Sequence, residues 1–483
     1  MRSPIFLEPD FRLVAAASAA LFLLPACPDR EVAEVHPFQI GAHPTVIPLG
    51  NNDLDILFVI DNSSSMLEEQ ESLAQNFNTF IDVLESAEGG LPDIHIGVVS
   101  TDMGAKAPGE PAIPNSAGPP GSGQTCDETG DGGKLQAAPR VAGCMPPTDP
   151  YISDIESNDD RVRNYSGDLA ETFSCIARLG TEGCVFEQQL ESMRAALDPA
   201  INPDFVRDGA YLAIVFITDE DDCSAQNPHI FNGDPALNTK GSELGYAISY
   251  RCFEFGVQCD QPVGRDPASY TGCTPRTDSP YLWNVQERYV DFLKNELGKP
   301  ADKIILAAIT GKIASDVDVI DRDRPDGVTD DVEVAPSCQS TGTGSAVPPV
   351  RISYLLDQFE DDHTYTAEIC QADLREPIED IANVIKEQVN ATCLGGNLVD
   401  GDTETPGLQP DCSVTKVTGG EQVGTLTQCD ASLSVTPCWR VEPGECEPDG
   451  GETYPAQLKL VVERNGQPPP VDTDLEVSCL VSG

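Results

Sequence analysis

The charge balance sets the first constraint on this chain. Among 483 residues, 80 acidic side chains stand against 29 basic ones, and the formal net charge is -51. Such a field repels the phosphate backbones of nucleic acids and attracts cations, which argues against a nucleic-acid partner. With 40% hydrophobic residues, the chain is long and apolar enough to fold into more than one domain.

The amino terminus is typical of an exported protein. An apolar stretch at residues 13–24 is too short to span a bilayer and suits a signal peptide. Leu24-Pro-Ala-Cys27 resembles a bacterial lipobox, in which the cysteine is lipidated and becomes the mature amino terminus. We predict a signal peptide over residues 1–27 and a lipid on Cys27, which anchors the chain to a membrane without spanning it. Ordinary cleavage, with Cys27 as a plain thiol or disulfide partner, is the alternative and gives a secreted protein.

Cysteine usage indicates an oxidising compartment. The chain has 17 cysteines and no C-x-x-C pair, which argues against zinc ribbons and iron–sulfur clusters. Disulfides outside the cytosol are the simpler account. Setting aside Cys27 leaves an even number of cysteines, which favours its lipidation.

Short apolar runs alternate with amphipathic segments. Continuous Val, Ile and Leu runs of this length are typical of strands buried on both faces of a parallel sheet. The predicted strands are residues 55–60, 95–100, 212–217 and 304–309. The predicted helices are residues 66–84, 186–197, 281–297 and 377–389. This alternation predicts an α/β fold with a doubly wound, mostly parallel sheet.

The chain divides into four predicted segments. Residues 28–52 are polar and contain proline, and are predicted to form a tether after the signal peptide. Residues 53–393 form the α/β domain, with long loop insertions at 104–150 and 223–280 that disulfides could order. Residues 394–483 contain five cysteines and several short β-like runs, and they are predicted to form a small disulfide-rich β module.

One motif stands where a ligand site is expected. Asp61-Asn-Ser63-Ser-Ser65 follows the first predicted strand and precedes a helix. Its side chains should therefore lie at the carboxyl edge of the parallel sheet, where open α/β sheets bind ligands. Capping of the helix amino terminus by Ser63 and Ser65 is the structural alternative.

These residues resemble the metal-ion-dependent adhesion site of the von Willebrand factor type A family. The family takes D-x-S-x-S after its first strand, a threonine from a middle loop and an aspartate after a later strand. Thr181, before the helix at 186–197, matches the threonine, and Asp219, after the strand at 212–217, matches the aspartate. The resemblance covers residues 53–393 and implies a Rossmann-like fold. The cysteines around the motif also resemble those of myxobacterial lipoproteins.

The resemblance implies a site for one divalent cation. Ser63, Ser65 and Thr181 would contact the ion through hydroxyls, and Asp61 and Asp219 directly or through water. Oxygen ligands suit Mg²⁺, with Ca²⁺ or Mn²⁺ as further candidates. A coordination position stays open for a carboxylate of a partner. Ser64 and Glu220 stand where many members have glycine, which leaves the choice of metal open.

The predicted function is adhesion at the cell envelope without catalysis. The partner would be a protein or extracellular matrix ligand that offers a carboxylate, and the membrane would be contacted by the lipid anchor only. The sequence contains no H-E-x-x-H, G-x-S-x-G or P-loop motif. An envelope hydrolase with a site beside the metal and a non-catalytic scaffold remain as alternatives. A disulfide between Cys175 and Cys184 could position Thr181, and an ordinary staple elsewhere is the competing pairing.

Overall fold

The computed structural model describes most of the chain from residue 43 onward. In the first part of the chain it describes residues 43–48, 53–86, 91–113, 126–140, 143–157, 160–322, 331–340, 344–360 and 363–389. In the last part it describes residues 393–394, 397–398, 400, 410–418, 421–429, 437–443, 458–463, 473–479 and 481–482. Cys27 and the predicted signal peptide lie outside the described residues.

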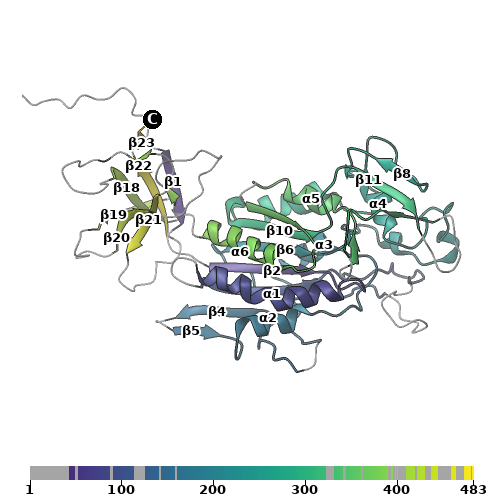
Figure 1. Ribbon diagram of the computed structural model, residues 1–483, viewed down its shortest axis with the longest axis horizontal. Coiled ribbons are helices and arrows are strands. Elements are labelled where there is room, and N and C mark those ends of the chain that lie inside the picture. Colours follow the sequence, from purple (N-terminus) through teal and green to yellow (C-terminus); the bar gives the residue numbers. More distant parts are fainter. Residues whose placement is uncertain are drawn as a thin grey trace, which may run out of the picture.

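A seven-stranded sheet forms the centre of the larger domain (Figure 1). Its order is β15-β10-β6-β2-β3-β4-β5, in which β15 to β3 run parallel and β4 and β5 form an antiparallel hairpin at one edge. The strands are β2 (Asp53–Ile60), β3 (Asp93–Ser100), β4 (Ile152–Ser157), β5 (Asp160–Arg163), β6 (Tyr211–Ile217), β10 (Ile304–Thr310) and β15 (Thr364–Glu368). The four strands predicted from apolar runs are β2, β3, β6 and β10, and all are confirmed.

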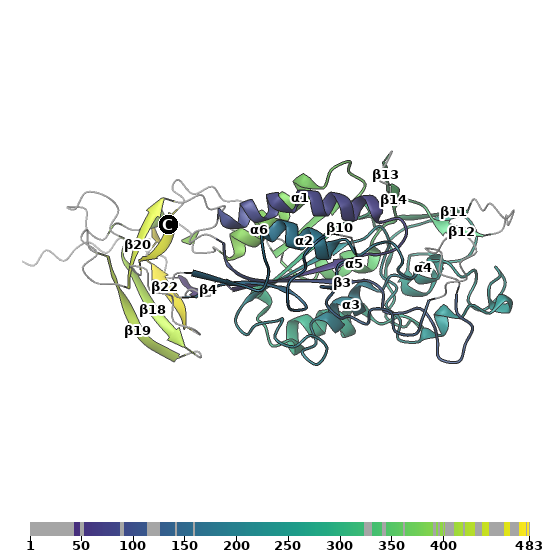
Figure 2. The same cartoon turned by 90° about the horizontal axis from the view of Figure 1, so that it is seen from below.

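Helices cover both faces of this sheet (Figure 2). On one face, Phe58 of β2 packs with the aromatic rings of Phe77, Phe80 and Phe173. That face carries α1 (Leu67–Glu85), α2 (Leu169–Ala177) and α6 (Arg375–Val389). The other face carries α3 (Gln189–Ala196), the π-helical segments η3 (Gln286–Val290) and η4 (Phe292–Glu296), and α5 (Val350–Leu356). Because alternate residues of a strand face opposite sides, both faces need apolar residues, which explains the continuous apolar runs. The predicted α/β fold class is confirmed.

The long intervals between strands carry small elements of their own. The interval after β6 holds η1 (Pro228–Phe231), η2 (Pro235–Leu237), α4 (Tyr250–Gly256), β7 (Val257–Gln258), β8 (Ala268–Tyr270) and β9 (Thr274–Pro275). The small elements just before and after β10 are η5 (Ala301–Lys303), β11 (Val317–Asp321), β12 (Val332–Val334), β13 (Cys338–Ser340) and β14 (Gly344–Ala346). Strands β8, β11 and β12 form one small antiparallel sheet.

A second sheet forms the carboxyl-terminal module at one end of the molecule (Figure 1). Its order is β1-β22-β18-β19-β20-β21-β16. Its strands are β1 (His43–Pro48), β16 (Cys393–Leu394), β18 (Cys412–Thr418), β19 (Glu421–Gln428), β20 (Cys438–Pro443), β21 (Leu458–Glu463) and β22 (Thr473–Cys479), while β17 (Asn397–Leu398) pairs with β23 (Val481–Ser482). Strand β1 belongs to the segment predicted as a tether, yet it pairs with β22 over six residues. The module therefore contains strands from both sides of the α/β domain in the sequence.

The chain enters and leaves the α/β domain at the same edge. Strand β2 begins at Asp53, shortly after β1, and α6 ends at Val389, shortly before β16. The second sheet is thus attached at the amino edge of the parallel strands, and the loops after their carboxyl ends lie at the opposite edge. No helix among the described residues is long and apolar enough to cross a membrane.

Seven disulfides join described cysteines, which confirms the prediction that most cysteines are paired. The pairs are Cys126–Cys184, Cys144–Cys175, Cys223–Cys252, Cys259–Cys273, Cys338–Cys370, Cys412–Cys479 and Cys429–Cys438. The suggested bond between Cys175 and Cys184 is wrong, since each pairs with a cysteine of the 104–150 insertion instead. Both predicted insertions are stapled by disulfides, as expected.

Candidate metal site

The candidate site lies where two neighbouring parallel strands end. Asp61 follows β2 directly, and Thr218 and Asp219 follow β6. The amide of Asp61 donates to the carbonyl of Ile217 at 2.9 Å, which continues the pairing of the two strands. Adjacent parallel strands place their carboxyl ends side by side, so Asp61 and Asp219 are brought together from positions far apart in the sequence.

Four of the five predicted ligands are linked by hydrogen bonds. The amide of Ser63 donates to Asp61 Oδ1 at 2.7 Å, and the hydroxyl oxygens of Ser63 and Ser65 are 3.2 Å apart. The Ser65 hydroxyl in turn donates to the carboxylate of Asp219. Asp61, Ser63 and Asp219 are buried and Ser65 is exposed. The group therefore has a buried, charged base and one face open to solvent.

The loop that carries Thr181 is held against the same motif. Gln70 of α1 donates from Nε2 to the carbonyl oxygens of Asp61 and Gly180 at 2.8 and 3.0 Å, and its Oε1 accepts from the Gly180 amide. The amide of Gly183 donates to the carbonyl of Asn62 at 2.9 Å. Thr181, which is half-buried, lies between these two attachment points.

A glycine is required for this approach of the loop. A Cβ atom at Gly183 would lie 2.4 Å from Asn62 Oδ1, far inside van der Waals contact. Only glycine lets the two backbones come this close. The short distance between the 180–183 loop and the D-x-S-x-S motif is thus encoded locally in the sequence.

The site holds more buried negative charge than its own residues neutralise. Burial raises the pKa of Asp61, and burial together with the charge of Asp61 raises the pKa of Asp219 to about 7. Burial and nearby carboxylates also raise the pKa of Glu69 to about 7, and that of Glu187 well above its usual range. The neighbouring charges that raise these pKa values are other carboxylates, so the group repels itself in the absence of a cation.

Two buried oxygens at the site are without a hydrogen-bond partner. Asp219 Oδ1 and Glu69 Oε2 are buried and unpaired among the described residues. An unpaired buried carboxylate oxygen is costly unless something binds it. Together with the hydroxyls of Ser63 and Ser65, these atoms are the oxygen ligands that a hard divalent cation prefers. The residues present therefore fit a divalent cation.

The ligand chemistry depends on the hydroxyl groups. Among the described residues, no group of three or more His, Cys, Asp or Glu side chains is arranged to hold a metal ion. A cation at this place would need the serine and threonine oxygens beside Asp61 and Asp219. A ligand set with few charges leaves part of the ion's charge available to a ligand from outside.

Sequence reasoning missed part of the site. Thr218 donates from Oγ1 to Asp61 Oδ2 at 2.6 Å and accepts from Gln189 Nε2 at 2.9 Å, so it orients the buried aspartate. Glu69 stands four residues after Ser65 in the first turn of α1, and its closeness in the sequence to the D-x-S-x-S motif could have indicated that it lies beside the site. Glu187 precedes α3 and approaches Asp61 only through the tertiary fold, which no local pattern shows.

Comparisons with known proteins give only distant structural matches to this chain. No family model and no curated protein matches it. Among solved structures, it matches a von Willebrand factor type A protein from Catenulispora acidiphila with 10% identity and a TM-score of 0.27, over 92% of this chain and 66% of that one. It matches the pilus adhesin SpaC from Lactobacillus rhamnosus GG with 12% identity and a TM-score of 0.30, over 91% of this chain and 41% of that one.

A third match is the vWF domain of the pili tip protein Mfa5 from Porphyromonas gingivalis. It has 13% identity and a TM-score of 0.30, over 74% of this chain and 99% of that one. These matches include proteins of the family that the sequence motifs resemble. This chain spans less than two thirds of the first two proteins, and identities and TM-scores this low establish no function for it.

Proposed function

We propose that this chain is a cell-surface binding protein that recognises an acidic group on a protein or matrix partner through a bound divalent cation, with Mg²⁺ as the preferred ion. The observation that supports this most is the hydrogen-bonded group of Asp61, Ser63, Ser65 and Asp219 at the end of two parallel strands, with Asp219 Oδ1 buried and unpaired. A bound cation would neutralise these buried carboxylates and give the unpaired oxygen a partner.

The ligands have distinct roles in this proposal. Asp61 and Asp219 supply the negative charge that holds the ion, directly or through water. The hydroxyls of Ser63, Ser65 and Thr181 supply neutral oxygens on the solvent side, where Ser65 is exposed. When bound, the cation supplies an open coordination position that a carboxylate of the partner can fill.

The chain's charge shapes which partners can be recognised. A net charge of -51 repels an acidic partner at long range, and salt screens that repulsion. Recognition of a carboxylate thus depends on the local positive charge of the ion. Binding without catalysis, and without nucleic acid, stays our prediction for this chain.

We further propose that the chain is held at the cell envelope by a lipid on Cys27. The signal-like sequence before Cys27 and the disulfides of the described domains support export to an oxidising compartment. The intact mass of the membrane-extracted protein tests this: we expect a chain that starts at residue 27 and carries a diacylglycerol-sized addition. An unmodified Cys27 would mean that the protein is secreted.

Removal of one carboxylate tests the metal site. In a calorimetric titration, wild-type protein should bind one Mg²⁺, and Asp219→Asn should lose roughly 100-fold or more in affinity because a charged ligand becomes neutral. Asp208→Asn is the matched control, since Asp208 is an exposed aspartate before the amino end of the same strand, and its Mg²⁺ affinity should not change. Equal Mg²⁺ binding by the two variants would contradict the proposed ligand set.

Once a partner has been isolated from envelope extract in Mg²⁺, its binding should be abolished by chelator and by Asp219→Asn. Retention of the partner in the presence of chelator would remove the metal-bridged mechanism.

A further inference from the structure

Two of the disulfides begin beside the candidate ligands. Cys184 stands three residues after Thr181, and Cys223 stands four residues after Asp219. Cys184 pairs with Cys126, and Cys223 pairs with Cys252 on α4. Each ligand loop is therefore covalently tied to a different insertion, one at 104–150 and one at 223–280.

Both disulfides enter a single apolar cluster, which we call the insertion core. Its members come from both insertions and from the two ligand loops. They are Ala105, Ile113, Cys126, Cys184, Phe186, Cys223, Ile230, Phe231, Leu244, Cys252, Tyr281 and Leu282. Cys126 and Cys223 are almost completely buried. The insertions thus pack together behind the loops that carry Thr181 and Asp219.

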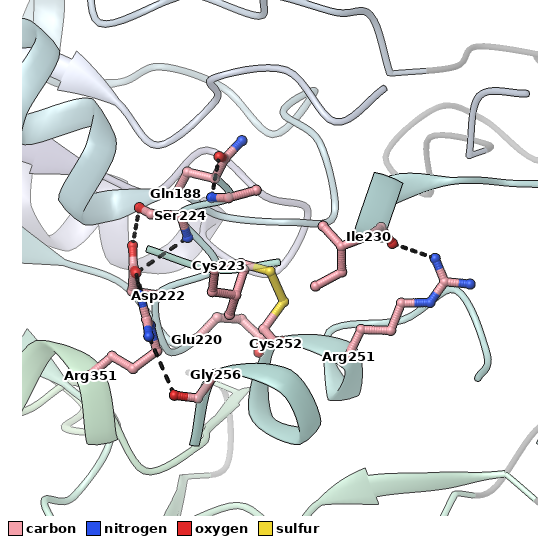
Figure 3. Close-up of a disulfide and its surroundings, with 12 residues drawn as sticks. Gln188, Glu220, Asp222, Cys223, Ser224, Ile230, Arg251, Cys252, Gly256 and Arg351 are labelled. Atoms are coloured by element: carbon pink, nitrogen blue, oxygen red, sulfur yellow. Dashed lines mark hydrogen bonds and ion pairs between the residues drawn. A yellow bond between two sulfur atoms is a disulfide. The ribbon is translucent and has the colours of Figure 1, made fainter. Parts of the chain in front are cut away.

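Polar contacts fix the backbone that leads from Asp219 into this core. The amide of Cys223 donates to the carbonyl of Glu187 at 2.8 Å, and Asp222 Oδ1 accepts from the Leu190 amide at the start of α3 at 2.9 Å. Asp222 also forms a fully buried ion pair with Arg351 at 3.1 Å (Figure 3). Figure 3 shows Glu220, Asp222 and Ser224 around the Cys223–Cys252 bond, with Arg351 on one side.

The segment from Asp219 to Cys223 therefore contains two aspartates in different surroundings. Asp222 is neutralised inside the protein by Arg351, whereas Asp219, three residues earlier, is not paired with a basic side chain in any described contact. Residues 222–223 are held by an ion pair, helix-capping bonds and a disulfide. This rigid end leaves little freedom for the position of Asp219.

We propose that the insertion core, closed by the Cys126–Cys184 and Cys223–Cys252 disulfides, positions Thr181 and Asp219 so that they can hold one cation together. The cysteines are positioning residues that do not touch the ion. This inference rests on the proposed function, and it gives the two insertions a role in positioning the metal ligands. A site held in its bound geometry before the ion arrives loses less entropy on binding, and therefore binds more tightly.

The experiment removes one disulfide at a time. Cys126→Ala/Cys184→Ala and Cys223→Ala/Cys252→Ala should each bind Mg²⁺ roughly 10-fold more weakly than wild type, the effect expected for groups that orient metal ligands. Cys259→Ala/Cys273→Ala is the control, because this disulfide also lies in the 223–280 insertion but belongs to a different apolar cluster. Its Mg²⁺ affinity should stay within about twofold of wild type.

A metal-free measurement separates positioning from general loss of stability. Hydrogen exchange of the Gly183 amide, which is bonded to Asn62, should become faster in the Cys126/Cys184 variant, while amides of the central strand β2 keep their protection. Should a cysteine variant fail to fold, Phe186→Leu trims the same core with both disulfides intact, and weaker Mg²⁺ binding is again expected.

The outcomes distinguish the two proposals. If wild-type protein binds no Mg²⁺, the proposed function fails and this inference fails with it. If wild-type protein binds Mg²⁺ and the disulfide and Phe186→Leu variants bind it equally well, only the positioning role is overturned. Equal weakening in the Cys259/Cys273 control would also overturn it, because the effect would then not depend on the insertion core.

Discussion

The two ends of strand β2 each hold a buried aspartate, and the two aspartates have different partners. Asp55, near the amino end of β2, is fully buried and is bound by Arg207, whose Nε lies 2.7 Å from Asp55 Oδ1 and whose amide donates to Oδ2. Asp61, at the carboxyl end, is equally buried and is bound by serine and threonine. Asp55 is thus paired with a cationic side chain, whereas Asp61 is bound by neutral groups alone.

This difference separates the paired buried acid from the unpaired acid of the candidate site in a chain that is acidic throughout. Buried charges are normally paired, because desolvation of an unpaired charge is costly. The amino edge follows that rule with Arg207 and Lys299, and β4 follows it with Asp154 and Arg161. The carboxyl edge departs from the rule at Asp61 and Asp219. Net charge alone does not single out these two residues, whereas the pattern of pairing does.

The largest effect should come from breaking the pairing at the amino edge. Arg207→Met leaves Asp55 buried without its partner and should lower the free energy of unfolding by about 3 kcal/mol. Urea denaturation measures this. Arg276→Ala, which removes a pair with the exposed Asp278, is the control and should cost less than about 1 kcal/mol. Mg²⁺ affinity should be unchanged in folded Arg207→Met, and a loss of it would break the distinction between the edges.

A smaller effect is expected from pH at the carboxyl edge of the metal-free protein. The pKa of Asp219 is about 7 in the folded chain, against an ordinary value of 3.8. Between these values the unfolded chain has released the proton and the folded chain retains it, so stability falls as pH rises through this window. From pH 5 to 8 in chelator, wild-type Tm should drop on the order of 5 °C relative to Asp219→Asn.

The variant is needed as the reference because His95 acts in the opposite direction. Burial lowers the pKa of His95 to about 4, so its contribution to stability grows as pH rises toward 6.5. That contribution cancels in the difference between wild type and Asp219→Asn. Saturating Mg²⁺ should remove the difference in pH dependence, because the ion replaces the proton. If the Tm values of wild type and Asp219→Asn change with pH by the same amount in chelator, Asp219 does not have the raised pKa on which this prediction depends.

The smallest effect concerns a neighbour of the ligands. The charge of Glu69 contributes to the raised pKa of Asp219. Glu69→Gln should therefore shift the pH midpoint of Mg²⁺ binding downward, by less than about one pH unit. Mg²⁺ titrations between pH 5.5 and 8 measure the midpoint. Much weaker Mg²⁺ binding at every pH would instead show that Glu69 holds the ion itself, which would extend the ligand set.

Local sequence patterns predicted the sheet and the place of the D-x-S-x-S motif at its carboxyl edge. Strands β2 and β6 are continuous apolar runs because both faces are covered, and a polar motif directly after such a strand must lie at its carboxyl edge. Asp61, Ser63 and Ser65 could be placed at that edge on this basis, whereas Asp219 was matched through the family resemblance. Their hydrogen bonds follow from the side-by-side arrangement of β2 and β6.

The rest of the site depends on contacts between distant segments. Glu187 approaches Asp61 only when α3 packs on the sheet, and disulfide connectivity cannot be deduced from spacing, which is why Cys175–Cys184 was wrong. Strand β1 was also missed. A six-residue strand with two prolines at an edge position of a sheet has little pattern of its own, and it is defined by its partner β22.

The entry of the chain through β1 into β2 has a mechanical consequence. If the protein is attached to the cell at any point before β1 and a partner pulls at Asp61, the shortest covalent path for tension runs from β1 through β2 alone. The backbone of β2 is continuous between these two points, so covalent bonds carry the tension, and the hydrogen bonds to β3 and β6 keep the strand in place. The disulfides of the insertions lie outside this path. Resistance to pulling is therefore expected to reside in the central strand, and to persist when the disulfides are reduced.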